Sequence, residues 1–259
     1  MSQREAQLKA FGALLDIMDE LREKCPWDKK QTMRSLRHLT IEETYELGDA
    51  ILDNDQDEIR KELGDLLLHI VFYAKIGSES KDFDIKDVIE GINEKLISRH
   101  PHVFGDVVAE TEEEVAKNWE QLKLKEGKKS ILEGVPKSLP ALVKASRIQD
   151  KAASAGFDWD RSEQVFEKVQ EEIEELHEEV NSGKQTRIES EFGDVLFSLI
   201  NYARHIKVDP ESALETTNKK FIKRFQYLET EAAKNGESLK DMTLPQMDVY
   251  WNESKKYFK

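Results

Sequence analysis

The sequence predicts an all-α protein, and three observations carry this prediction. Glycine and proline are scarce, at 12 and 6 of 259 residues, so the chain has few points at which a helix must end. Charged residues make up 36% of the chain, and the abundant Glu and Lys, together with Leu, favour helices. Apolar residues recur at three- and four-residue spacing in the longer segments, as on one face of a helix.

The first 24 residues mix charges with apolar residues at helical spacing and lack the apolar core of a signal peptide. No uninterrupted apolar stretch approaches the about 20 residues that span a membrane. Cys25 is the single cysteine, which excludes an intramolecular disulfide and a thiolate metal site. The net charge of −14 repels nucleic-acid backbones. We expect a cytoplasmic protein that binds neither nucleic acid nor membrane.

Two helical segments, 39–76 and 169–206, share one layout. Five carboxylates of the first segment recur 129 residues later, so that Glu42, Glu43, Glu46, Glu62 and Asp65 match Glu171, Glu172, Glu175, Glu191 and Asp194. A basic helix follows each segment, and Asn93, Lys95 and Arg99 match Asn218, Lys220 and Arg224 at an offset of 125. A solvated acidic face has no reason to keep these positions in register while the intervening residues diverge.

Between the two copies, residues 123–140 are rich in Lys, Gly and Pro, which is typical of a linker. We therefore expect an N-terminal domain at 1–122, a linker at 123–140 and a C-terminal domain at 141–259.

Each repeated segment is expected to form a helix hairpin. In the second copy, residues 181–184 are a turn signal between two helices. Glu175 and Glu191 both lie eight residues from Gly183, and Glu172 and Asp194 both lie eleven residues from it. Residues equidistant from a turn lie at similar heights in an antiparallel hairpin, so these four carboxylates should converge. In the first copy the matching four, Glu43, Glu46, Glu62 and Asp65, are centred on Asn54 in the same way.

Four converging carboxylates require a compensating cation. Ligand sets made of oxygen alone favour Mg²⁺ or Mn²⁺ over zinc, and Mg²⁺ usually bridges carboxylates to substrate phosphates. The pairs Lys95 and Arg99, and Lys220 and Arg224, have the i, i+4 spacing that places two cations on one helical face. Each pair is either a set of phosphate contacts or an ordinary solvated basic face.

Other patterns leave alternatives open. Glu174 and His177 form a Glu-x-x-His pair of the kind found in di-iron bundles, but the first copy has Tyr45 and Gly48 at the matching positions. Gly64 and Gly193 lie inside strongly helical segments, where a missing side chain makes room for a ligand, for a neighbouring helix or for a tight helix crossing. The histidines His100 and His102 are expected to be loop residues. Base stacking or core packing is open for the tryptophans Trp27, Trp119, Trp159 and Trp251.

The paired EExxE and ExxD motifs, together with CPWDKKQT, RHPHVF and the late NxKFxxR, resemble the MazG nucleoside triphosphate pyrophosphohydrolases. This resemblance covers nearly the whole chain. It implies tandem MazG-like helical domains, whose hairpins pack into four-helix bundles across a homodimer. The implied activity is Mg²⁺-dependent hydrolysis of NTPs or dNTPs to NMP and diphosphate with broad base specificity, in nucleotide-pool housekeeping. The alternative is a non-catalytic helical module that senses nucleotides or docks a partner.

The resemblance also implies residue roles. The metal ligands are Glu172, Glu175, Glu191 and Asp194. Substrate contacts are implied for Glu171, Glu175, Asp194, Lys220, Arg224 and Trp251, of which Glu171, Lys220 and Arg224 are also implied in catalysis. The N-terminal candidates are Glu42, Glu43, Glu46, Glu62, Asp65, Lys95 and Arg99. We expect the second copy to carry most of the hydrolysis, because residues 218–224 hold four cations and residues 93–99 hold two cations and Glu94.

Overall fold

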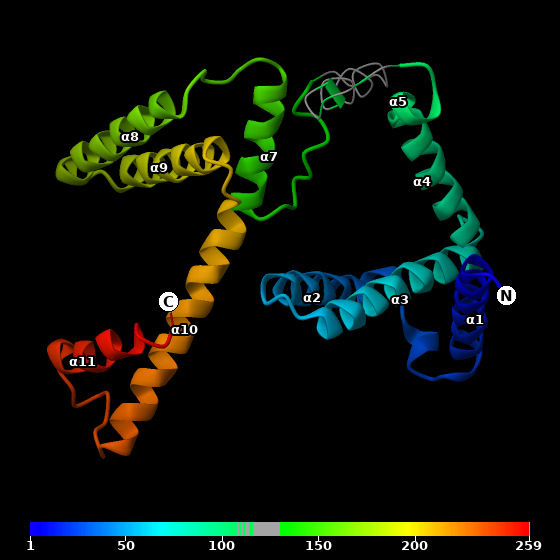
Figure 1. The fold of residues 1–259 in the computed structure, drawn as a ribbon, viewed down its shortest axis with the longest axis horizontal. Coiled ribbons are helices and arrows are strands. Elements are labelled where there is room, and N and C mark those ends of the chain that lie inside the picture. Colours follow the sequence, from blue (N-terminus) through cyan, green and yellow to red (C-terminus); the bar gives the residue numbers. More distant parts are fainter. Residues whose placement is uncertain (108, 110, 112–113, 116–129, 259) are drawn as a thin grey trace. The chain divides into compact units, whose positions relative to one another are not determined.

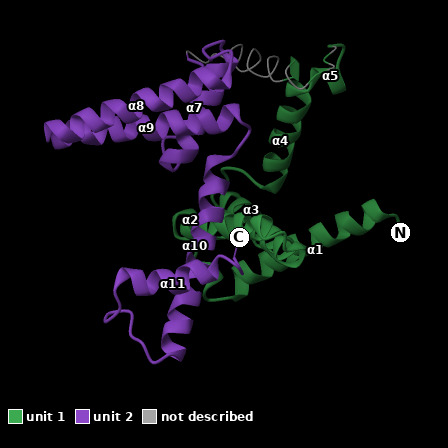
Figure 2. Cartoon of the chain, turned by 60° about the vertical axis from the view of Figure 1, so that its left-hand side comes forward, with its two compact units in different colours: residues 1–115 green, residues 116–259 purple. Residues whose placement is uncertain are grey.

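The chain folds into two compact units, residues 1–115 and 116–259 (Figure 2). The computed structural model describes residues 1–107, 109, 111, 114–115 and 130–258. These residues form helices and no strands, which confirms the all-α prediction (Figure 1). The predicted domain boundaries stay a prediction, and residues 123–129 and Trp119 lie outside the described residues.

Unit 1 is built from α1 (Gln3–Lys24), the short 3₁₀ helix η1 (Asp28–Lys30), α2 (Met33–Leu52), α3 (Gln56–Ser80), α4 (Ile85–Arg99) and α5 (Pro101–Phe104). Side-chain caps fix where the helices begin: Ser2 accepts from the backbone N–H of Glu5, and Asp55 accepts from the N–H groups of Asp57 and Glu58. Asn54 has a φ of 53°, a left-handed conformation that Asn tolerates and that lets the chain reverse between α2 and α3.

The core of unit 1 joins its first three α-helices. Met18 from α1, Leu36 from α2, and Val71 and Phe72 from α3 form one buried cluster. Thr40 and Tyr73 add a hydroxyl–hydroxyl hydrogen bond of 2.6 Å between α2 and α3. This packing holds the α2–α3 hairpin in the register that the carboxylates need.

Unit 2 contains α7 (Ala141–Ser154), α8 (Ser162–Ser182), α9 (Gln185–His205), α10 (Pro210–Lys234) and α11 (Leu244–Ser254). Helices α8 and α9 form the predicted hairpin (Figure 1), and Gly183 supplies the left-handed turn with a φ of 72°. Helix α8 ends at Ser182, so it extends two residues into the predicted turn at 181–184. The buried residues of the hairpin include Val165, Val169, Val195 and Ile200.

Both predicted hairpins are therefore confirmed as helix pairs, whereas the expected four-helix packing across a homodimer stays a prediction. None of the helices in the described ranges combines the length and the apolar character that crossing a membrane requires. The expected cytoplasmic location is likewise a prediction still.

Candidate active site

Three of the four predicted metal ligands of unit 2 converge. Glu172 and Glu175 of α8 and Glu191 of α9 place carboxylate oxygens within 4.8 Å of one another. Asp194, one helical turn beyond Glu191, is not a member of this group but lines the same cavity as Glu172. We call Glu172, Glu175 and Glu191 the C-terminal acidic group.

Unit 1 repeats the arrangement with the matching residues. Glu43 and Glu46 of α2 and Glu62 of α3 form an N-terminal acidic group, again with oxygens within 4.8 Å of one another. Asp65 is not a member, yet its charge acts on Glu43 and Glu62 and raises the pKa of both. The equidistance from the turn predicted that four carboxylates converge in each hairpin, and three of each four meet in this way.

A lysine compensates the C-terminal acidic group. The Nζ atom of Lys168 lies 2.7 Å from Oε1 of Glu171 and 2.7 Å from Oε1 of Glu172. Hydrogen bonds to Glu171 and then to Glu172 raise the pKa of the Lys168 ammonium. The pKa of Glu175 is raised by desolvation and then by repulsion from Glu172, and the charge of Lys168 partly offsets that rise.

The N-terminal acidic group has Leu39 at the position that matches Lys168. There, desolvation raises the pKa of Glu62, and a hydrogen bond with Glu43 raises it further. Desolvation also raises the pKa of Glu43, whereas the hydrogen bond with Glu62 lowers it. The net pKa of both carboxyls is raised, so burial of this pair makes its charged form more costly in the absence of a compensating cation.

Both acidic groups fit a hard divalent cation. Their donors are carboxylate oxygens alone, the set that Mg²⁺ and Mn²⁺ favour. Desolvation and mutual repulsion raise pKa values in each group, and a bound dication would reverse both effects. In unit 1, Oε2 of the buried Glu62 accepts no hydrogen bond within the described part of the chain.

A cavity of about 420 Å³ adjoins the C-terminal acidic group. Glu172 and Asp194 line it beside Lys168, and Phe157 and Trp159 add two aromatic rings to its wall. Trp159, left open between stacking and core packing by the sequence, is 41% exposed and faces this cavity. An acidic group beside an aromatic cavity can hold a cation and a planar ring next to each other.

The segment that carries the two aromatic residues is fixed to α9. Asp158 accepts hydrogen bonds from Nη1 of Arg204 at 2.8 Å and from Nε2 of His205 at 2.9 Å, with a further short contact from Nη2 of Arg204. Desolvation opposes the charge of Asp158, but these hydrogen bonds outweigh it and lower its pKa to about 2. No local pattern predicts this clamp, because Arg204 and His205 lie 46 and 47 residues after Asp158 in the chain.

The predicted phosphate and nucleotide contacts lie on the last two helices. Arg224 of α10 donates from Nε and Nη2 to the Phe258 carbonyl at 2.9 and 2.7 Å, and its guanidinium lies 5.9 Å from the Trp251 ring centroid. The structure therefore brings Arg224 and Trp251 together. Within the described part of unit 2, no hydrogen bond or ion pair joins Lys220, Arg224 or Trp251 to the C-terminal acidic group. In unit 1, Lys95 and Arg99 lie in the second half of α4.

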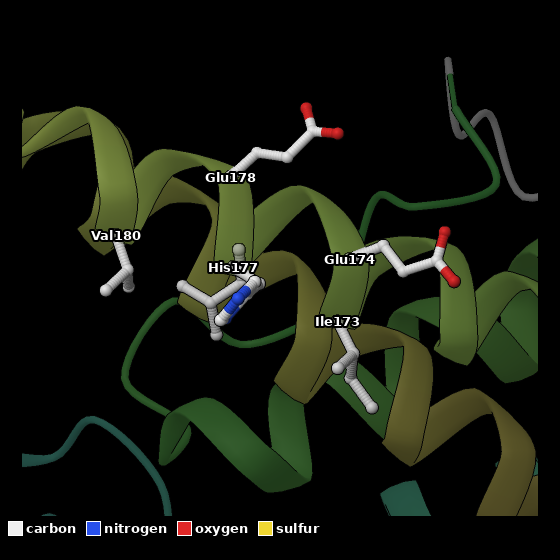
Figure 3. A pocket seen from close by; sticks show the side chains of 6 residues that line it. Ile173, Glu174, His177, Glu178 and Val180 are labelled. Atoms are coloured by element: carbon white, nitrogen blue, oxygen red, sulfur yellow. The ribbon is translucent and has the colours of Figure 1, made fainter.

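The di-iron alternative finds no support in the described residues. Glu174 and His177 belong to neither acidic group. Figure 3 shows Ile173, His177 and Val180 projecting from one side of α8, while the Glu174 and Glu178 carboxylates extend away from them. These residues line a shallow depression in the surface of α8.

The remaining sequence patterns have structural outcomes. His100 lies at the α4–α5 junction, but His102 lies in α5 and not in the predicted loop; their ring centroids are 5.6 Å apart, and neither belongs to a metal-binding group of the described residues. Trp27 is 55% exposed. A Cβ atom built at Gly64 or Gly193 would meet nothing within 4 Å, so a tight helix crossing inside the chain does not explain either glycine.

Known proteins resemble this chain over nearly its whole length. The model of the MazG nucleotide pyrophosphohydrolase domain matches the chain twice, at residues 31–104 and 161–228. The chain is 45% identical to the nucleoside triphosphate pyrophosphohydrolase/pyrophosphatase MazG of Thermotoga maritima, over 95% of both chains. It is 43% identical to the nucleoside triphosphate pyrophosphohydrolase of Escherichia coli K12, over 96% of this chain and 98% of that protein. Each domain match contains one acidic group, and the chain is therefore an enzyme of the MazG nucleotide pyrophosphohydrolase family.

Proposed function

We propose that this protein hydrolyses nucleoside triphosphates, or their deoxy forms, to the monophosphate and diphosphate, and that unit 2 performs the reaction. The observation that carries the proposal is that Glu172, a member of the C-terminal acidic group, also lines the aromatic cavity. This arrangement suits a substrate with a charged polyphosphate at one end and a planar base at the other.

Glu172, Glu175, Glu191 and Asp194 would hold the Mg²⁺, or Mn²⁺ in its place. A divalent cation held by these carboxylates supplies positive charge and Lewis acidity to the polyphosphate. The same carboxylates would repel a triphosphate in the absence of the cation, so substrate binding should depend on the metal.

Lys168 and Glu171 supply two further functions. Lys168 now bridges Glu171 and Glu172, and a cation on Glu172 would compete with its ammonium. The released ammonium lies close enough to the acidic group to contact a phosphate oxygen. Glu171, freed from that ion pair, would accept a proton from the attacking water.

The base would occupy the aromatic cavity, stacked on Trp159 or Phe157. Stacking tolerates any base, which supports hydrolysis across the four common nucleotides in a nucleotide-pool housekeeping role. The Asp158 clamp would hold the aromatic wall in place, because it ties the segment between α7 and α8 to α9.

We also propose a homodimer. Lys220, Arg224 and Trp251 are the expected phosphate and nucleotide contacts, yet no described hydrogen bond or ion pair places them at the acidic group of their own chain. A second copy could bring them there. Exposed apolar residues on α8 and α9 supply a surface for it, and Ile173, Val180 and Phe192 are 49%, 51% and 54% exposed.

A substrate panel tests the proposed reaction. The purified chain is incubated with Mg²⁺ and each of the common NTPs and dNTPs, and the products are separated by ion-exchange chromatography. NMP and diphosphate are the expected products, and omission of Mg²⁺ should abolish them. Release of NDP and phosphate would contradict the proposed bond cleavage. Tight nucleotide binding without any turnover would instead support a sensing module.

A further inference from the structure

The cavity beside the C-terminal acidic group is lined by a buried glutamine whose amide nitrogen is hydrogen-bonded and whose amide oxygen is not. Gln149 of α7 lines the cavity and is 5% exposed. Its Nε2 donates to the Phe197 carbonyl of α9 at 2.8 Å. Its Oε1 is buried and accepts no hydrogen bond within the described part of the chain.

The orientation of this amide is fixed by its neighbour. A flipped amide would place Oε1 against the Phe197 carbonyl, and two acceptors would then face each other. Gln149 therefore offers an acceptor that the protein itself does not use. Buried polar groups normally find partners, so a buried acceptor without one, on a residue that lines a ligand cavity, is a candidate contact for the ligand once the side chain adjusts to it.

Three other polar residues of the cavity already have hydrogen-bond partners within the protein. Asn201 Oδ1 accepts from Arg204 at 3.1 and 2.9 Å, and Ser198 Oγ donates to the Val195 carbonyl at 2.9 Å. Asp158 accepts from Arg204 and His205. Glu172 and Asp194 also line the cavity, but their carboxylates are assigned above to the cation, so Gln149 is the neutral lining residue considered for reading the base.

We propose that Gln149 is a specificity-determining residue, whose Oε1 accepts a hydrogen bond from the exocyclic amino group of the substrate base. The proposal rests on the nucleotide binding proposed above. Adenine and cytosine present amino donors, whereas their deaminated forms, hypoxanthine and uracil, present carbonyl oxygens at the same positions. An acceptor that faces a carbonyl is left unpaired and repelled, so the site should favour the amino bases.

The test compares each amino substrate with its deaminated partner. For the wild-type chain we expect kcat/KM to be about tenfold higher for ATP than for ITP, and for CTP than for UTP, the size of one selective hydrogen bond. Gln149→Leu removes the acceptor at similar volume and should bring both ratios close to one. In this variant the kcat/KM values for ATP and ITP should become similar, because the variant loses the selection between the two bases and keeps the hydrolysis.

Ser198→Ala is the matched control, because Ser198 lines the same cavity but spends its hydroxyl on its own helix. Both ratios should stay at the wild-type value in this variant. Thermal unfolding shows whether the Gln149→Leu variant is folded. If that variant does not fold, Gln149→Met is used in its place. Wild-type ratios near one, or ratios that Gln149→Leu leaves unchanged, would overturn the proposal.

Equilibrium binding of the same four nucleotides by calorimetry separates this inference from the proposed reaction. Discrimination in binding that disappears in Gln149→Leu supports the role of Gln149 even if no hydrolysis is seen. Hydrolysis without discrimination supports the reaction and overturns the role of Gln149. Failure of all four nucleotides to bind would overturn both.

Discussion

The α2–α3 and α8–α9 hairpins hold the same acidic group but neutralise it by different means. In unit 2 the ammonium of Lys168 bridges Glu171 and Glu172. In unit 1 the matching position is Leu39, and desolvation raises the pKa of both Glu62 and Glu43, which favours their neutral forms. The duplication has kept the carboxylates that converge while their surroundings diverged. Identical ligand sets therefore do not imply identical sites.

The surroundings differ in two further respects. His69, which matches Ser198, is buried in α3 with Nδ1 unbonded among the described residues, and desolvation lowers its pKa. The cavity of about 420 Å³ adjoins the acidic group of unit 2, whereas a cavity of about 240 Å³ in unit 1 is lined by α1, α3 and α4 and not by the acidic residues. Together with the four cations of residues 218–224, these differences favour unit 2 as the hydrolytic site.

The matched variants Glu46→Ala and Glu175→Ala are the strongest test of that choice. Each removes one carboxylate from one acidic group. We expect Glu175→Ala to lower kcat/KM for NTP at least about 100-fold, and Glu46→Ala to change it less than about threefold, because cation-assisted chemistry depends on the ligand set. Steady-state kinetics with the same NTP panel measures both. Greater damage from Glu46→Ala would place the active site in unit 1.

Glu172→Gln tests whether the carboxylate of Glu172 is needed for activity but not for folding. The variant loses a metal ligand, so we expect hydrolysis to fall by at least about 100-fold. Lys168 keeps Glu171 as its partner and repulsion of Glu175 decreases, so the unfolding temperature without Mg²⁺ should stay level or rise. Circular dichroism melts measure the second effect. A variant with full activity would remove Glu172 from the site, unless a double variant with Glu46→Ala shows that unit 1 supplied the turnover.

Exchanging Lys168 and Leu39 should make the Mn²⁺ affinities of the two acidic groups more alike. Lys168→Leu removes a cation that competes with the metal, so we expect Mn²⁺ to bind unit 2 several-fold more tightly, on the order of threefold to tenfold. Leu39→Lys should weaken Mn²⁺ binding to unit 1 by a similar factor. Calorimetric titration of each variant, with the other acidic group disabled by Glu46→Ala or Glu175→Ala, isolates the site. Weaker Mn²⁺ binding by Lys168→Leu would show that the lysine supports the metal.

The Asp158 clamp has a pH signature. The pKa of Asp158 is lowered to about 2, so its stabilising effect is complete above its ordinary pKa and is lost as the pH falls below about 4 toward 2. We expect Asp158→Asn to lower the unfolding temperature at pH 7 by a few degrees and to match the wild type near pH 2. Asp160→Asn, at an exposed neighbouring position, should differ little at either pH. An Asp158→Asn deficit that persists at pH 2 would mean that the carboxylate charge is not the cause.

The glycines give the smallest expected effect and also test the homodimer. A Cβ at Gly64 or Gly193 meets nothing within 4 Å, so each Gly→Ala change should stabilise its helix by up to about 1 kcal/mol. Light scattering at micromolar concentration should give a dimer mass for the wild type. If a second copy packs on Gly193, Gly193→Ala should shift the chain toward monomer. A wild-type monomer would contradict the dimer outright.

The hairpins could be predicted because local and repeated signals agree. Gly183 and Asn54 marked the turns, and the equal distances of Glu175 and Glu191 from Gly183, with Glu172 one helical turn before Glu175, predicted which carboxylates meet. The repeat identified the residues that both copies share, but it could not identify functional residues that are present in one copy alone. Lys168 lies three residues before Glu171 and four before Glu172, on one helical face. Its counterpart in the first copy is Leu39, so the repeat did not mark Lys168 as a site residue.

The cavity could not be predicted for a different reason. Gln149 and Phe197 are 48 residues apart, and Asp158 and Arg204 are 46 apart, so their contacts exist only once α7 and the following segment pack on α9. Helical periodicity reports which face of a helix is apolar but not which helix covers it.

The Lys168 bridge also determines the order in which the enzyme can be assembled. Because a built-in ammonium pairs with Glu171 and Glu172, we expect the α8–α9 hairpin to fold without a metal ion and to bind the proposed ion afterwards. Metal binding there would exchange one cation for another. The α2–α3 hairpin has Leu39 in place of that lysine, so its acidic group would depend more on an ion that is present while the hairpin folds.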